Sequence, residues 1–235
     1  MEELRPSSSC KLGRKEYWSE FYSTELENFE DYGDSGDIWF GKKNLERIVK
    51  WLDNNRINKC LPILDVGCGN GMTLISLFKV GCEDLTGIDF AEEAILLAKK
   101  IAQNKNMKIN LEVITLKTAY NKVVLDFLKE DIKSFSMFCN KEFHVIIDKG
   151  TYDAICLDVE HVEEKRNKYI NQILNLLSSD GYFLLFSCNW TKEELLFHFK
   201  EFMLHEEIEI PSIGFGGKVG QTVTALVMKK CASTS

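Results

Sequence analysis

Short apolar runs alternate with longer amphipathic segments through the first half of the chain. Three runs predict strands, at Leu61 to Val66, Leu85 to Asp89 and Asn110 to Thr115. Between them, apolar residues recur at helical spacing over Gly71 to Lys79 and Ala91 to Gln103, which predicts helices. Strands that alternate with helices in this way indicate a parallel sheet with helices on both faces.

The second half continues this pattern and then departs from it. Strands are predicted at 143–148 and 181–187, with an amphipathic helix before the second of them. Two further strand-like runs, at 206–210 and 222–230, are separated by a glycine-rich turn and no helix, so we expect them to pair antiparallel. The predicted fold class is therefore α/β: a single Rossmann-like, doubly wound, mostly parallel sheet with an antiparallel C-terminal strand.

The N-terminal region differs in character from the rest of the chain. Residues 1–16 are polar and Ser-rich, and they predict a disordered tail before a single domain at 17–235. Residues 17–41 are dense in aromatic and acidic side chains, and Leu45, Ile48, Val49 and Leu52 then mark one face of a helix. The stretch 116–129 fits no element clearly.

Composition and charge narrow the classes of function. The 235 residues, 45% hydrophobic and 28% charged, fit one domain with one large core. The net charge of -7 argues against nonspecific nucleic-acid binding and leaves a basic protein surface as a partner that charge allows. Without a long apolar run or a signal peptide, we expect a cytoplasmic monomer with no membrane partner, and the nucleus stays open as a second compartment.

The eight cysteines are scattered along the chain. None forms a Cys-x-x-Cys pair, and no histidine lies at metal-ligand spacing from any of them. We therefore expect buried, reduced thiols and no metal site.

A glycine-rich loop follows the first predicted strand and carries the first chemical signal. The strand ends at Asp65, and the loop contains Gly67, Cys68, Gly69 and Gly71. Glycines at these places let the backbone turn tightly and approach a ligand. A dinucleotide fingerprint would need a third glycine at position 72, where this chain has Met72. The spacing instead resembles the first motif of the seven-strand Rossmann-like methyltransferases, although such a turn can also be purely structural.

Two acidic positions follow the glycine loop in the order that a nucleoside site requires. Asp89 ends the second strand, where its carboxylate can accept both ribose hydroxyls, and Phe90 can pack against an adenine ring. As an alternative, Asp89 caps the following helix. Asp131 and Ile132 resemble the acidic motif that meets the adenine amino group in this class, and a solvated charge cluster is the alternative.

The carboxyl ends of the fourth and fifth strands lie where this fold places the methyl acceptor. Methyl transfer from a sulfonium needs alignment and exclusion of water, without a covalent nucleophile. Asp148, Tyr152 and Trp190 are the candidates for positioning the acceptor around one narrow entrance. As alternatives, Asp148 orients the cofactor's ammonium, Tyr152 begins the next helix, and Trp190 packs in the core. Lys149 beside Asp148 is expected to stay charged, which makes it a poor base.

Longer motifs resemble one family, the lysine methyltransferases that modify translation elongation factor 1-alpha. They are YWSEFYSTELENFEDYGDSGDIWFG, LDVGCGNG, GIDF, IIDKGTYDAI, SCNWTKEEL and FGGKVGQTVTALV. The resemblance implies a class I S-adenosylmethionine-dependent protein-lysine N-methyltransferase that acts on this factor. It further implies that segment 17–41 covers the cofactor, with Trp39 over the pocket, and that Asp65, Gly67, Asp89 and Asp131 keep their binding roles. The chain departs from the family pattern at 116–129, which looks long.

Other functions fit the same fold. A small-molecule methyltransferase is the nearest alternative, although such enzymes often add a lid over the substrate. An NAD-dependent oxidoreductase and a noncatalytic Rossmann-like binding module belong to other classes, and fold alone excludes neither.

Overall fold

A seven-stranded mixed sheet organises the computed structural model, which describes residues 10–114, 141–158, 161–211, 214–215, 218–219 and 223–231. Asp131 and Ile132, for which adenine contacts are predicted, lie outside the described residues. The strand order is β3-β2-β1-β4-β5-β9-β6. The strands are β1 Ile63–Val66, β2 Leu85–Asp89, β3 Asn110–Val113, β4 Phe143–Lys149, β5 Leu177–Ser187, β6 Phe202–Glu207 and β9 Thr224–Lys230.

The predicted fold class is confirmed by the pairing of these strands. β3, β2, β1, β4 and β5 are parallel, whereas β9 lies antiparallel to both β5 and β6. The order reverses at β1, and β1 pairs with β2 on one side and β4 on the other. Ligands of open α/β sheets bind at the carboxyl ends of the strands beside such a reversal, so this topology places the site before any side chain is considered.

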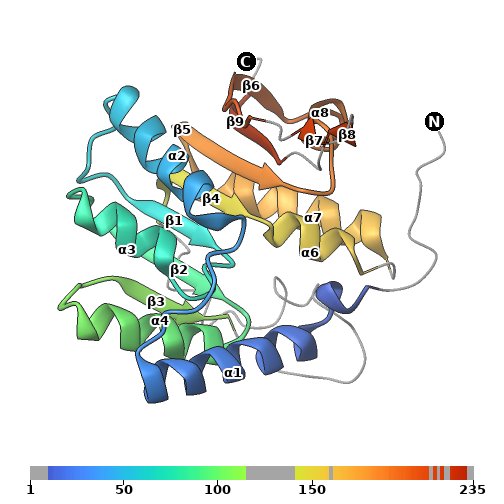
Figure 1. Ribbon diagram of the computed structural model, residues 1–235. Helices are drawn as coiled ribbons and strands as arrows, with labels where there is room; N and C mark the ends of the chain where they lie inside the picture. The colour runs from blue at the N-terminus through green and yellow to red at the C-terminus, as the bar shows by residue number, and fades with distance from the viewer. Residues whose placement is uncertain are drawn as a thin grey trace.

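Helices cover both faces of the sheet, as the alternating pattern predicts (Figure 1). α2 Gly41–Asn54, α3 Met72–Lys79 and α4 Glu92–Asn104 pack over one face. α6 Thr151–Cys156, α7 Val162–Leu176 and α8 Lys192–His198 pack over the other. Each face has its own apolar core, because successive strand residues point to opposite sides of a sheet. Ile63 and Ile147 belong to the first core, and Leu64 and Ile146 to the second.

The N-terminal region is helical, which the sequence reasoning did not predict. A 3-10 turn, η1 Lys11–Gly13, leads into α1 Lys15–Tyr32, and Gly33 ends that helix in the left-handed conformation. Figure 1 shows α1 running along α4 at the foot of the view. The predicted tail boundary at residue 16 is too late, because η1 already packs against α6.

Two predicted boundaries near the C-terminus also need correction. β5 begins at Leu177 rather than at 181, and β6 spans Phe202–Glu207 rather than 206–210. The expected antiparallel pairing of β6 and β9 is confirmed. A short hairpin, β7 Gly214–Phe215 with β8 Lys218–Val219, lies between them. No helix in the described ranges is long and apolar enough to cross a membrane.

Candidate active site at the carboxyl ends of the strands

The loop that follows β1 is a tight glycine turn. Gly67, Gly69 and Gly71 all adopt positive φ angles, of 66°, 53° and 72°, which side chains other than glycine rarely tolerate. The backbone N–H of Cys68 donates to Ile88 O at 3.0 Å, which ties the loop to β2. The glycines therefore shape a backbone surface at the topological reversal of the sheet.

Asp89 joins this loop to the next helix. Its carboxylate accepts the Gly69 N–H and the Ala91 N–H, both at 2.9 Å, and the side chain is 5% exposed. Burial raises its pKa to about 6, against the lowering effect of these backbone donors. These bonds close the turn before α4, whose N-cap is Ala91 without a side-chain cap, so the helix-cap alternative for Asp89 is wrong. Each carboxylate oxygen keeps a further lone pair for a ligand hydroxyl.

Asp65 contributes a second buried carboxylate beside the loop. The residue is 1% exposed, and within the described part of the chain its Oδ2 atom has no hydrogen-bond partner. Burial raises its pKa to about 6, while the charge of Lys149 and a hydrogen bond from Thr73 lower it. A buried acceptor without a partner costs free energy, so Asp65 presents an oxygen that a bound cation or N–H donor would satisfy.

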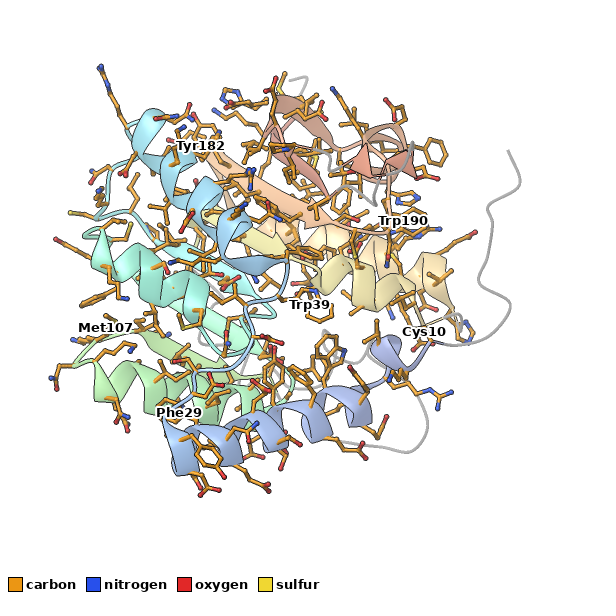
Figure 2. All side chains as sticks on the ribbon, in the orientation of Figure 1. Cys10, Phe29, Trp39, Met107, Tyr182 and Trp190 are labelled. Atoms are coloured by element: carbon orange, nitrogen blue, oxygen red, sulfur yellow. The ribbon has the colours of Figure 1, made fainter. Side chains whose placement is uncertain are left out.

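Aromatic residues from the N-terminal region cover this end of the sheet (Figure 2). A Cβ atom added to Gly150 would lie 2.7 Å from Trp39 Nε1, so the indole rests on the backbone that follows β4. Trp18 of α1 packs edge-on against Trp39 with ring centroids 5.2 Å apart. The Asn70 amide donates to the Ser35 and Asp37 carbonyls at 2.9 and 3.0 Å. The glycine loop thus holds the covering segment in place.

Tyr22 is a site residue that the sequence reasoning missed. Its hydroxyl lies against Gly69, where any Cβ atom would collide with it. Burial raises the pKa of this phenol well above its ordinary value, and the nearby Asp89 raises it further. Trp18 and Tyr22 stand four residues apart and stack with centroids 6.2 Å apart. That helical spacing within the aromatic block is the signal that could have identified α1 and its inward face.

Asp148 has a different set of partners from the predicted one. It is fully buried, and its carboxylate accepts the Thr151 and Tyr152 N–H groups at 2.8 and 2.9 Å and the Tyr169 hydroxyl. Burial raises its pKa to about 7, although the Tyr169 hydroxyl lowers it. These contacts hold the start of α6 and join it to α7. The contacts of Asp148 with the acceptor and with the cofactor's ammonium stay predictions.

Tyr152 and Trp190 lie in one aromatic cluster, but they do not share an open entrance with Asp148. Tyr152 is 0% exposed, and its hydroxyl contacts His198 Nδ1 at 2.9 Å. Trp190 is half-buried and packs edge-on against His198, with ring centroids 4.7 Å apart. Tyr152 therefore supports the core between α6 and α8, and Trp190 alone of the three reaches the surface.

The loop after β5 is fixed by a carboxylate on α6. Asp153 accepts the Ser187 hydroxyl at 2.5 Å and the Cys188 N–H at 2.8 Å. The Ser187 oxygen in turn accepts the N–H groups of Asn189 and Trp190 at 3.2 and 3.1 Å. These bonds fix the loop residues 188–190. Because β5 neighbours β4, this loop lies beside the covered end of the sheet.

The remaining predicted contacts have less structural support. Phe90 is half-buried directly after Asp89, and its contact with an adenine ring stays a prediction. In the described ranges, no group of three or more His, Cys, Asp or Glu side chains is arranged to hold a metal ion.

Comparison with known proteins assigns the chain to a family of enzymes. A family model described as a methyltransferase domain matches residues 57–210. EEF1A lysine methyltransferase 2 of Mus musculus is 41% identical over 93% of this chain and 84% of its own length. Protein-lysine N-methyltransferase efm4 of Schizosaccharomyces pombe is 33% identical over 93% of this chain and 94% of its own.

Solved structures show the same fold at low sequence identity. An S-adenosylmethionine-dependent methyltransferase from Clostridium acetobutylicum has a TM-score of 0.58 and 12% identity, covering 90% of this chain and all of its own, 100%. A TehB-like S-adenosylmethionine-dependent methyltransferase from Corynebacterium glutamicum has a TM-score of 0.54 and 18% identity, covering 91% and 98%. At these identities the likeness establishes the architecture alone.

Proposed function

Because the chain belongs to the family of protein-lysine methyltransferases that includes EEF1A lysine methyltransferase 2 and efm4, we propose that it methylates a lysine of translation elongation factor 1-alpha with S-adenosylmethionine. One structural observation carries the proposal. The buried Asp89 carboxylate is bonded to the Gly69 backbone at the reversal of the sheet, under an aromatic cover.

The residues present fit S-adenosylmethionine. Asp89 would hold the ribose, Phe90 would contact the adenine, and the backbone at Gly67 to Gly69 would lie along the amino-acid end. Asp65 has a buried oxygen without a hydrogen-bond partner among the described residues. A positively charged group of the ligand would bind to this oxygen. When bound, S-adenosylmethionine supplies an electrophilic methyl carbon on a positively charged sulfur.

The chain itself contributes to methyl transfer by aligning the lysine amine with the methyl carbon and by excluding water. A lysine must lose its proton to attack, and an apolar or aromatic wall lowers the pKa of an amine by desolvation. Trp39 and Trp190 are two aromatic side chains near the carboxyl ends of β4 and β5, and both retain exposed surface. Asp148 acts indirectly, because it fixes the start of α6 through the Thr151 N–H. The Thr151 hydroxyl in turn donates to Val66 O at 2.7 Å.

A protein substrate is supported by the charge on α1. The helix has six acidic residues and one lysine, and most of these side chains face solvent beside the covered site. Acidic surfaces of this kind speed the encounter with a basic protein and make it dependent on salt. We place the enzyme in the cytoplasm as part of the proposal.

Incubation with a labelled methyl donor and a cell lysate tests the substrate class. We expect label on one protein band that comigrates with elongation factor 1-alpha. Label found only in soluble metabolites would show a small-molecule methyltransferase, and the proposal would then be abandoned. The Asp89→Ala variant serves as the negative control, because it lacks the ribose acceptor.

A further inference from the structure

Lys149 lies at the carboxyl end of β4 and has no part in the chemistry described so far. Asp148, the residue before it, turns toward Tyr169 of α7. Because side chains alternate along a strand, Lys149 points to the opposite face, the one that Ile147 shares with α2 and α3. Asp65 is on this same face, since it pairs with Ile147 across β1 and β4. Lys149 and Asp65 are therefore diagonal neighbours at the edge of the site.

The two charges act on each other without forming an ion pair. Lys149 lowers the pKa of Asp65, and burial lowers the pKa of Lys149 while Asp65 and Asp148 raise it. Lys149 is half-buried, and in the described part of the chain no hydrogen bond or ion pair joins its ammonium to another residue. The Oδ2 atom of Asp65 likewise has no partner there. One cation and one anion thus stand side by side, each with free bonding capacity.

The aromatic cover closes over this pair. Gly150 follows Lys149 directly, and Trp39 lies on it. On the other side, Lys149 pairs in the strand register with the fully buried Phe186 of β5. Charges confined between aromatic and apolar walls are costly to leave unmatched, and a ligand with complementary charges removes that cost.

We propose that Lys149 binds the carboxylate and Asp65 the ammonium of the amino-acid end of the methyl donor. The inference rests on the proposed function, and it assigns Lys149 a role that neither the glycine loop nor Asp89 supplies. An α-amino acid carries its two charges on one carbon, so a lysine and an aspartate on adjacent strands match both of them at once. A charge-assisted hydrogen bond from Lys149 would discriminate for the carboxylate.

The assignment predicts that the site rejects ligands without that carboxylate. S-adenosylhomocysteine and its decarboxylated analogue, which keeps the amine, differ only in this group. Isothermal titration calorimetry of the wild-type protein should show that the analogue binds roughly ten- to a hundredfold more weakly, the ordinary effect of losing a hydrogen bond between charged groups. Equal affinities for the two ligands would overturn the proposal without any variant.

The Lys149→Met variant then ties this preference to one side chain. It should lose affinity for S-adenosylhomocysteine by roughly ten- to a hundredfold and bind the analogue as the wild type does. An equal loss for both ligands would show that Lys149 acts through packing, and it would refute the carboxylate contact. Lys149→Arg should keep most of the preference, because it retains a cation.

Lys141→Met is the matched control. Lys141 precedes β4 at the opposite edge of the sheet, where it pairs with Asp84 at 2.8 Å, so its loss should leave both affinities unchanged. The experiment also separates this inference from the proposed function. A wild-type protein that binds no S-adenosylhomocysteine contradicts the function itself, whereas binding without a carboxylate preference contradicts only the role of Lys149.

Discussion

At the end of β2, the carboxylate of Asp89 accepts one backbone N–H from the glycine loop and one from the start of α4. The same group is the predicted ribose acceptor. Folding and binding therefore depend on one side chain, and a substitution there is expected to alter both the stability of the protein and its affinity for the cofactor.

The Asp89→Ala variant should bind S-adenosylhomocysteine roughly ten- to a hundredfold more weakly, because a charged acceptor of ribose hydroxyls is lost. Its free energy of unfolding should also fall by about 1 to 3 kcal/mol, because two buried N–H groups lose their partner. The variant should therefore unfold at a lower denaturant concentration. Calorimetry and chemical denaturation measure the two effects. Asp180→Ala, at an exposed position of β5, is the control. Unchanged affinity in a folded Asp89→Ala variant would refute the ribose assignment.

Trp190 is the member of the predicted acceptor group that reaches the surface. We expect Trp190→Ala to lower turnover on a protein substrate, by roughly tenfold or more, while the dissociation constant of S-adenosylhomocysteine changes little. Steady-state kinetics and calorimetry compare the two quantities. Phe197→Ala is the control, because Phe197 is 77% exposed on the neighbouring helix. Turnover at the wild-type rate would mean that Trp190 only packs against His198.

At the scale of elements, α1 and the segment after it form a cover tied to the glycine loop. Asn70 makes the connection through two hydrogen bonds to backbone carbonyls of that segment. Trp39 then reaches Gly150 beyond β4. The cover lies over the reversal of the sheet. The glycine loop beneath it holds it in place through Asn70.

Asn70→Ala should therefore speed the release of S-adenosylhomocysteine. Loss of two hydrogen bonds weakens the cover by about 1 to 3 kcal/mol, or roughly ten- to a hundredfold in dissociation rate if the cover must open first. Stopped-flow fluorescence of the tryptophans would report the rate. Asn55→Ala, at the far end of α2, removes a comparable bond to Trp51 O and should leave release unchanged. Equal release rates in all three proteins would show that the cover does not control the cofactor.

The elements that sequence patterns identified have either a continuous apolar run, as in the fully buried β2, or apolar residues at helical spacing. The predicted bounds agree with β2 to the residue and with α3 and α4 to within one residue, and the predicted helix face at Leu45 to Leu52 lies in α2. α1 was missed because aromatic and acidic side chains alternate along it and only Phe29 is buried. The glycine loop and Asp89 were recognisable from spacing, whereas the partners of Asp148 and Tyr152 depend on helices distant in sequence.

In the molecule as a whole, three buried carboxylates have pKa values that burial raises. Burial raises the pKa values of Asp65 and Asp89 to about 6 and that of Asp148 to about 7. Their folded pKa values exceed the ordinary value of about 4, so the stability they contribute is present below about pH 4 and is lost as the pH rises through about 6 to 7. At neutral pH, keeping these buried carboxylates ionised therefore costs free energy, and a bound cation would offset that cost.

The affinity for S-adenosylhomocysteine should consequently rise with pH through about 6, as Asp65 and Asp89 lose their protons. The ligand-induced shift in melting temperature should be larger at about pH 8 than at about pH 5. Differential scanning fluorimetry with and without ligand measures it. An Asp65→Asn variant should show a weaker dependence on pH. A shift that is equal or larger at the acidic pH would contradict the role of the two carboxylates as ionised acceptors.

Mass spectrometry of purified elongation factor 1-alpha tests the central claim most directly. The factor is incubated with S-adenosylmethionine and either the wild-type protein or the Asp89→Ala variant, and its peptides are then sequenced. The account predicts one or more methyl groups on a lysine side chain after reaction with the wild type, and far fewer with the variant. An unmodified factor, or methylation at a residue other than lysine, would contradict it.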